Sequence, residues 1–239
     1  MKRKRKGKPV LILISIAGLC AVAYFAFLRS KSVIPKSVIL DVPFISQKAD
    51  FPTGCESVSA VMALNYLGVD ITVDEFVDDY LDTGNAPSAD KSGKLVGTNP
   101  RRAFVGDPRS EHGWGCYASV IVNAVNKIID SAKFTVSEIS DKTIDELCRE
   151  YIDNGVPVLI WATVEMVTPL SAVSWTDEIT GERIEWVSPM HCLVLVGYDK
   201  DCYYFNDPLE HKNISHKKSL VKSAYDGLYR QAVVIEAVR

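Results

Sequence analysis

Cys55 and Gln47 are the residue types that thiol catalysis needs. Cys55 follows Gly54 and precedes a run of small and apolar residues that closes at Leu67-Gly68, a pattern that predicts a helix beginning at the cysteine. Free backbone N–H groups at a helix start favour a thiolate, so we expect the Cys55 pKa to lie below its usual value of about 8.5. Gln47 is one of only two glutamines, and its amide could donate into an oxyanion hole. The alternative role for Cys55 is that of a small buried hydrophobe.

A thiolate nucleophile also needs a general base and a residue that orients the base. His191 stands near the start of an apolar segment, residues 190–198, which has the length and β-branched character of a strand. A polar turn at 199–201 leads into a second strand at 202–208. The sequence therefore predicts a hairpin that carries the base.

The register of this hairpin selects the orienting residue. With a three-residue loop, Tyr198 pairs with Cys202, and His191 becomes the diagonal neighbour of Asp207 on one face. A shift of one residue would place Asn206 on that face instead. We expect Asp207, with Asn206 as the alternative, and either side chain could hold the imidazole in its useful tautomer.

The order Gln47, Cys55, His191, Asp207 resembles that of the papain-like cysteine peptidases. Within these, the match is to the branch related to the double-glycine leader peptidases of bacteriocin exporters, over about residues 38–238. The resemblance implies Cys55 as nucleophile, His191 as general base and then acid, and Asp207 as the orienting residue. It also implies an oxyanion hole made by Gln47 and the backbone N–H of Cys55.

The residue after the nucleophile departs from the exporter-linked enzymes. They have glycine there, whereas this chain has Glu56, as in the free-standing relatives. Its charge suits the first turn of a helix. The departure leaves the substrate preference open.

Cys116 is the rival nucleophile. Gly115-Cys116 precedes another predicted helix, and His112 is close by, but no glutamine lies just upstream and no acid is placed on a following strand. As a buried helix residue Cys116 would be ordinary. The long segment that ends here, residues 82–115, is rich in Gly, Pro, Ser and Asn, and a loop of that length is usually functional or disordered. We expect it to form a wall of the substrate groove.

The N-terminus has the pattern of a membrane anchor. Residues 1–8 hold six Lys or Arg, residues 9–28 carry no charge, and residues 29–36 form a short linker before a domain at 37–239. Twenty apolar residues span a bilayer, and the basic flank predicts a single pass with the N-terminus in the cytoplasm and the domain outside the cell membrane. Cleavage at Ala21-Val22-Ala23 and lipidation at Cys20 are the alternatives.

Charge and cysteine spacing argue against nucleic-acid binding and against a zinc site. Residues 9–239 carry 21 basic and 30 acidic side chains, a net charge of −9, which argues against a nucleic-acid partner. The cysteines show no zinc-site spacing, and we expect neither a metal nor an organic cofactor. Cys148 and Cys192 fit a core, while disulfides remain open among four cysteines: Cys116, Cys148, Cys192 and Cys202.

The order of elements predicts an α+β domain with helices on one side of a mainly antiparallel sheet. The resemblance implies the same papain-like fold, here preceded by one transmembrane helix. Expected helices cover 55–67, 72–81, 116–129 and 141–152; expected strands cover 37–44, 133–139, 156–162 and 228–238, with a further hairpin turning at Thr180-Gly181 between Trp175 and Trp186. His211 and His216 fall in an expected solvated loop.

These features predict a membrane-tethered, extracytosolic cysteine peptidase that acts on a peptide or protein substrate. Two alternatives remain open. The same residues could hydrolyse cell-wall peptide crosslinks, or the domain could be a non-catalytic binding module on the same scaffold.

Overall fold

The structure is a computed structural model that describes residues 37–238. The predicted basic tail at 1–8, the anchor at 9–28 and the linker at 29–36 lie outside the described residues. Within residues 37–238, no helix combines the length and the apolar character needed to cross a membrane.

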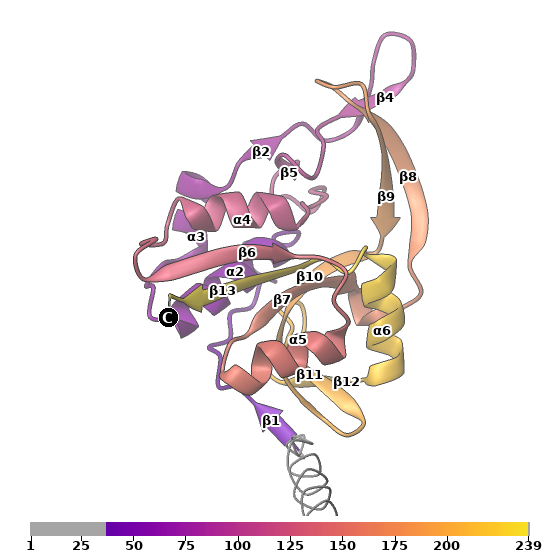
Figure 1. The fold of residues 1–239 in the computed structure, drawn as a ribbon. Coiled ribbons are helices and arrows are strands. Elements are labelled where there is room, and N and C mark those ends of the chain that lie inside the picture. Colours follow the sequence, from indigo (N-terminus) through magenta and orange to yellow (C-terminus); the bar gives the residue numbers. More distant parts are fainter. Residues whose placement is uncertain (1–36, 239) are drawn as a thin grey trace, which may run out of the picture. The chain divides into compact units, whose positions relative to one another are not determined.

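A seven-stranded sheet forms the centre of the domain (Figure 1). Its order is β12-β11-β10-β7-β13-β6, with β1 added to β10, and every pair is antiparallel. The strands are β1 (Ser37–Ile39), β6 (Phe134–Ile139), β7 (Val158–Thr163), β10 (Met190–Asp199), β11 (Cys202–Asn206), β12 (Ile214–Lys217) and β13 (Ala232–Ala237). β7 is buried along its whole length, as expected of a strand covered on both faces. The predicted α+β content and mainly antiparallel sheet are confirmed.

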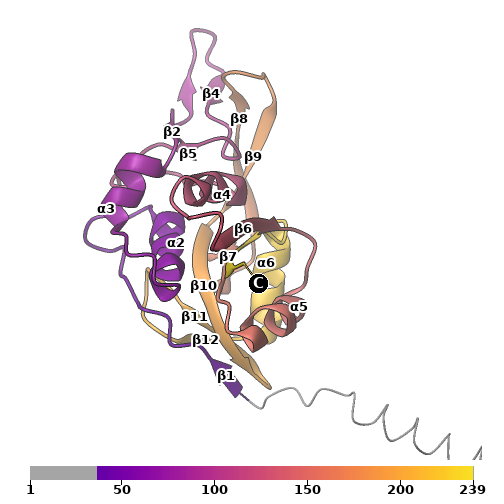
Figure 2. The ribbon, with the colours of Figure 1, turned by 60° about the vertical axis from the view of Figure 1, so that its left-hand side comes forward.

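Helices cover both faces of this sheet (Figure 2). α2 (Cys55–Tyr66) and α4 (Ala118–Asn126) pack on one face, and α5 (Ile144–Glu150) and α6 (Lys218–Gly227) pack on the other. The expectation of helices on one side only was wrong. The sequence of α6 is mostly polar, and the helix buries only three side chains, Val221, Ala224 and Tyr225. Because so few of its residues are apolar, the sequence pattern is similar to that of a loop.

The segment after Pro208 is therefore more ordered than the solvated loop that we expected. It contains β12 and α6, and His216 lies partly buried on β12. Burial lowers the pKa of His216. His211 stays exposed, as expected.

Shorter elements complete the region around α2. In place of the single helix expected at 72–81, a capping box formed by Thr72 and Glu75 opens α3 (Val73–Glu75), which continues as a π-helical turn, Phe76–Tyr80. β2 (Thr83–Gly84) pairs in parallel with β5 (Phe104–Val105). Single 3-10 turns occupy Ile152–Asn154 and Val164–Met166.

A second, four-stranded sheet extends beyond the central one (Figure 1). Its order is β3 (Ser88–Ala89), β4 (Leu95–Gly97), β8 (Leu170–Asp177) and β9 (Arg183–Ser188). The β8–β9 hairpin turns at Thr180-Gly181 as predicted, and Gly181 adopts φ +74°, a conformation that favours glycine. This hairpin leads directly into β10 and so into the candidate site.

The register of the β10–β11 hairpin differs from the prediction near its turn. Tyr198 pairs with Tyr203, not with Cys202, and a bulge between Leu195 and Gly197 then restores the predicted register, so that Val194 pairs with Asn206. A side chain at Gly197 would collide with the Val38 carbonyl of the adjoining β1. The bulge accommodates one extra residue in β10, so the end of the hairpin near His191 has the predicted register.

Asp177 holds the β8–β9 turn against the body. It is 2% exposed, accepts two hydrogen bonds from Arg102 at 2.8 and 3.1 Å, and also accepts from the Thr180 backbone at 3.0 Å. The hydrogen bonds from Arg102 hold the pKa of Asp177 well below its ordinary value. The folded carboxyl is thus more acidic than the unfolded one, so its contribution to stability is present above the ordinary pKa of about 3.9 and is lost as the pH falls below it.

We therefore expect Asp177→Ala to lower the free energy of unfolding at neutral pH by about 2 kcal/mol, because hydrogen bonds to charged groups contribute roughly 1.5–3 kcal/mol. Urea unfolding measures this loss, which should shrink as the pH approaches about 3. The control is Asp226→Ala, which removes an exposed ion pair with Arg230. An equal, small effect of both substitutions would contradict the anchoring role of Asp177.

Candidate active site

α2 places Cys55 at its first position, directly after Gly54. An added Cβ at Gly54 would lie 3.0 Å from the Phe51 side chain, so the close approach of the preceding turn favours glycine. Residues 55–64 are all buried, which matches their small and apolar sequence. The start of the helix therefore lies within the domain, and Cys55 itself is 6% exposed.

His191 and Asp207 form the expected pair. His191 lies on β10, Asp207 directly follows β11, and Nε2 of the ring is 2.7 Å from Oδ1 of the carboxylate, with both side chains buried. Burial opposes the ionisation of Asp207, but the hydrogen bond and charge of His191 outweigh it and lower the carboxyl pKa. Because a carboxylate only accepts, the ring donates from Nε2, which leaves Nδ1 for another partner.

Asn206, the alternative orienting residue, has a different task. Its Nδ2 donates to the carbonyls of Val42 and Pro43 at 3.0 and 3.3 Å, and its Oδ1 accepts from the Asn213 N–H at 3.1 Å. It ties the segment that leads to Gln47 to the central sheet.

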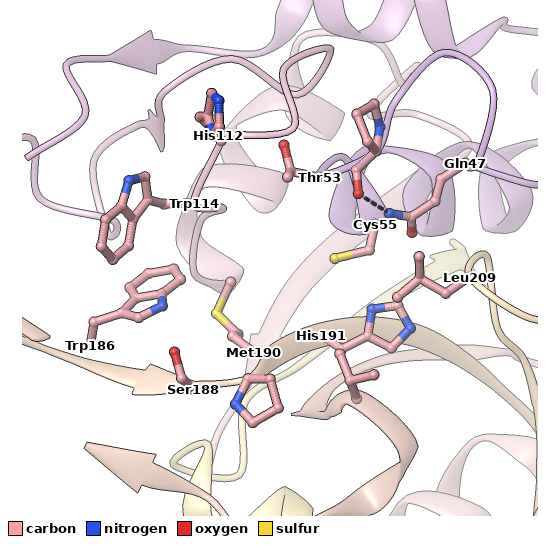
Figure 3. Close-up of a pocket in the computed structure, with 14 residues that line it drawn as sticks. Gln47, Thr53, Cys55, His112, Trp114, Trp186, Ser188, Met190, His191 and Leu209 are labelled. Atoms are coloured by element: carbon pink, nitrogen blue, oxygen red, sulfur yellow. Dashed lines mark hydrogen bonds between the residues drawn. The ribbon is translucent and has the colours of Figure 1, made fainter. Parts of the chain in front are cut away.

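Gln47 is buried and lies near both Cys55 and His191. Its backbone N–H donates to the Pro208 carbonyl at 3.0 Å, next to Asp207, and its Nε2 donates to the Pro52 carbonyl at 2.8 Å (Figure 3). A carbonyl only accepts, so this contact fixes which end of the amide is nitrogen, and Nε2 keeps a second proton. Oε1 has no hydrogen-bond partner among the described residues. This arrangement leaves a donor for an oxyanion.

Gln47, Cys55 and His191 line one cleft of about 530 Å³ (Figure 3). His112, Gly113 and Trp114 form one wall, so the end of the segment 82–115 borders this cleft, while the rest of the segment does not line it. The other lining residues are Pro52, Thr53, Val164, Trp186, Ser188, Pro189, Met190 and Leu209. Three of the four predicted site residues therefore share the cleft, and Asp207 supports it from behind His191.

Aromatic packing holds the cleft wall. Trp114 packs edge-to-face on Trp186 and Trp175, with ring centroids 5.8 and 5.4 Å apart. Trp186 lines the cleft, whereas Trp175 is 2% exposed and donates to the Thr98 carbonyl. Both tryptophans thus belong to the core, and Trp186 also borders the cleft.

The Cys55 thiol does not contact His191 in this structure. Its Sγ donates to Oε2 of Glu56 at 3.3 Å and accepts from the Cys192 N–H at 3.3 Å, and Figure 3 shows the sulfur pointing away from the His191 ring. Burial, followed by the charge of Glu56, raises the Cys55 pKa well above its ordinary value. The expectation of a lowered pKa was wrong for this side-chain position, because desolvation and the carboxylate outweigh the helix start.

The remaining cysteines fit structural positions. Cys116 is fully buried, and its carbonyl accepts from the Trp161 indole at 2.8 Å, so the rival nucleophile has no access to the cleft. Cys148 and Cys192 lie in the core as predicted, and all five cysteines within residues 37–238 are free. In this part of the chain no three His, Cys, Asp or Glu side chains gather as a metal site.

Glu56 is the site residue that the sequence reasoning misplaced. We interpreted it as a charge suited to the first turn of a helix, but its side chain is fully buried against the nucleophile. The residues around Glu56 in the sequence could have indicated its burial. It is the single charged residue in the otherwise small and apolar run from Cys55 to Leu64.

A cysteine at a helix start, a histidine paired with an aspartate and a buried glutamine near one cleft are the residue types that cysteine peptidases use. The chain belongs to the Peptidase_C39 like family, whose sequence pattern matches residues 39–233. This confirms the resemblance seen in the sequence.

Two relatives illustrate the match. Uncharacterized protein YvpB of Bacillus subtilis (strain 168) is 29% identical over 183 residues, which cover 77% of this chain and 69% of YvpB. A crystal structure from Bacillus anthracis, described as a C39-like peptidase, is 26% identical with a TM-score of 0.72, covering 85% of this chain and 98% of that one.

Proposed function

We propose that the protein hydrolyses peptide amide bonds with Cys55 as nucleophile, His191 as general base and acid, Asp207 as orienting residue and Gln47 in the oxyanion hole. The observation that best supports this is the buried 2.7 Å contact between His191 and Asp207. It leaves Nδ1 as the free ring nitrogen in a cleft that Cys55 and Gln47 also line.

The reaction begins when the Cys55 sulfur approaches Nδ1 of His191 and transfers its proton to that nitrogen. The thiolate attacks the substrate carbonyl, and the developing oxyanion accepts hydrogen bonds from Nε2 of Gln47 and the backbone N–H of Cys55. The imidazolium then protonates the leaving amine. A water molecule, deprotonated by His191, releases the acyl group and restores the thiol.

The chemistry of the cleft supports an uncharged substrate segment. None of its lining residues is Lys, Arg, Asp or Glu, and Trp114, Trp186 and Met190 supply apolar surface. Apolar walls with a few convergent polar groups are typical of ligand sites. We expect the residue beside the scissile bond to be small or apolar.

The proposal includes a location. The basic residues 1–8 and the uncharged residues 9–28 favour a membrane tether that leaves the domain outside the cell. An active site on that side would meet extracytosolic peptides and not cytosolic leader peptides.

Incubating the full-length protein in detergent with a peptide library and, separately, with purified peptidoglycan tests the function. Mass spectrometry should find new amino termini in the library with the wild type and none with Cys55→Ala. Release of crosslinked cell-wall peptides alone would favour the alternative hydrolase. Absence of cleavage in both, with retained peptide binding, would point to a binding module.

Gln47→Ala is expected to lower kcat by about 10²–10³-fold with little change in KM, because one oxyanion donor is lost. Steady-state kinetics on a library-derived peptide measure this. The matched control is Gln231→Ala, which removes the second glutamine of the chain, a buried side chain that bonds to Ala118 and Leu228 away from the cleft. A kcat for Gln47→Ala equal to that of the control would contradict the oxyanion role.

A further inference from the structure

Glu56 is a buried acid that the mechanism above does not use, yet it touches the nucleophile. Its side chain is fully buried, and its Oε2 accepts the thiol proton of Cys55 at 3.3 Å. The other oxygen, Oε1, accepts the backbone N–H of Cys116 at 2.7 Å. The carboxyl therefore lies between the sulfur and the chain segment that enters α4.

The fold makes room for this carboxyl. Gly115 adopts φ +123°, and a Cβ there would lie 2.5 Å from Oε1 of Glu56 and 2.5 Å from the Met190 side chain. A glycine is thus required both by the backbone conformation and by the space that Glu56 occupies. The Glu56 carboxyl therefore occupies a defined buried position beside Gly115 and does not lie on a solvated helix face.

The groups around Glu56 act on its pKa in opposite directions. Burial raises its pKa to about 7, although hydrogen bonds from the backbone N–H groups of Cys116 and of Glu56 itself, the Cys55 thiol and the charge of His191 all favour the ionised form. The titratable groups that face it are Cys55 on α2, Cys116 ahead of α4, and Cys192 and His191 on β10. None of these is a Lys or Arg that could neutralise a carboxylate permanently.

Two neighbouring anions cannot both form here. A thiolate on Cys55 and a carboxylate on Glu56 would lie 3.3 Å apart between two buried side chains, where like charges strongly disfavour each other. A protonated Glu56, in contrast, would donate its O–H to the thiolate sulfur, as the Cys192 N–H already does. The protonation state of Glu56 therefore decides whether the nucleophile can form.

We propose that Glu56 is a further catalytic residue that controls the ionisation of Cys55, so that only the enzyme with a protonated Glu56 forms the Cys55 thiolate. The step is balanced within the site: the S–H bond breaks, the electron pair stays on sulfur, Nδ1 of His191 takes the proton, and the Glu56 O–H donates to the sulfur. When Glu56 is ionised it instead accepts the thiol proton and holds Cys55 neutral. This inference rests on the proposed function and adds an upper pH limit to it.

The test is the rate at which iodoacetamide modifies Cys55 in the full-length protein, followed by residue-resolved mass spectrometry from about pH 5 to about pH 9.5. In the wild type the rate should pass a maximum below about pH 7 and fall at least about 10-fold by about pH 8.5, as Glu56 loses its proton. An ordinary cysteine shows a rate that rises throughout this range. A wild-type rate that rises steadily through about pH 9 would overturn the proposal without any variant.

Glu56→Gln keeps an acceptor for Cys116 and a donor for the sulfur but does not titrate. We expect its rate to match the wild type within about threefold near pH 6 and to exceed it by roughly 10- to 30-fold near pH 8.5. Glu75→Gln, which alters an exposed capping carboxylate on α3, should leave the wild-type profile unchanged. A Glu56→Gln profile with the wild-type alkaline limb would overturn the proposal.

The same measurement separates this inference from the proposed function. Fast labelling of Cys55 that His191→Ala abolishes, but with a steadily rising pH profile, would reject the role of Glu56 alone. Slow labelling at every pH that His191→Ala does not change would reject both.

Discussion

Replacing Cys55 with alanine is expected to abolish peptide hydrolysis, with kcat/KM reduced by at least about 10⁴-fold. No other described side chain in the cleft can take over, because Cys116 and Cys192 are fully buried and their sulfurs do not line it. The Cys55 side chain is small, so the fold should be retained. Kinetics on a cleaved library peptide, together with thermal unfolding, measure both effects.

The matched control is Cys148→Ala, which removes an equally buried cysteine on α5, on the opposite face of the sheet from Cys55. It should cost stability through a lost core contact and leave kcat/KM near the wild-type value. Residual activity of Cys55→Ala comparable to that of this control would exclude Cys55 as the nucleophile.

The second large effect concerns Asp207. Asp207→Ala should lower kcat/KM by roughly 10²–10⁴-fold, because the imidazole loses the partner that orients it and supports its positive charge. The same variant leaves Nε2 of the buried His191 without an acceptor, so we also expect lower thermal stability.

Asp207→Asn should be much milder, retaining activity within about tenfold of the wild type, since a Cys–His pair oriented by asparagine also serves in papain-like proteases. Oδ1 accepts both from His191 and from the Leu209 N–H at 2.9 Å, and these two donors would hold the amide oxygen in the same place. An alanine variant as active as the asparagine variant would show that Asp207 does not orient the base.

The parts of the site that the sequence predicted are those with strong local patterns. Gly54-Cys55 ahead of a small and apolar run marked the nucleophile helix, and the apolar strand beginning at Met190 marked the base. The pairing of His191 with Asp207 followed from the hairpin register, although the register at the turn was wrong by one residue. No local sequence pattern predicts the bulge between Leu195 and Gly197, which restores the predicted register on the side of the hairpin that carries the site.

What the sequence did not reveal depends on burial and on long-range packing. α6 shares one face of the sheet with α5 and buries only three apolar side chains, so its mostly polar sequence was interpreted as a loop. Glu56 is next to Cys55 in the chain, but its carboxyl lies against Gly115 and Cys116, which are distant in sequence. For the same reason the Cys55 pKa was predicted in the wrong direction, since the helix start is local and desolvation is not.

The most direct test of the central claim, that His191 ionises Cys55, is competitive labelling of the native full-length protein with iodoacetamide at about pH 6.5. Peptide mapping should show Cys55 modified at least about 100-fold faster than Cys202, the partly exposed cysteine, and His191→Ala should remove that preference. Equal and slow modification of the two cysteines, unchanged in His191→Ala, would contradict the account.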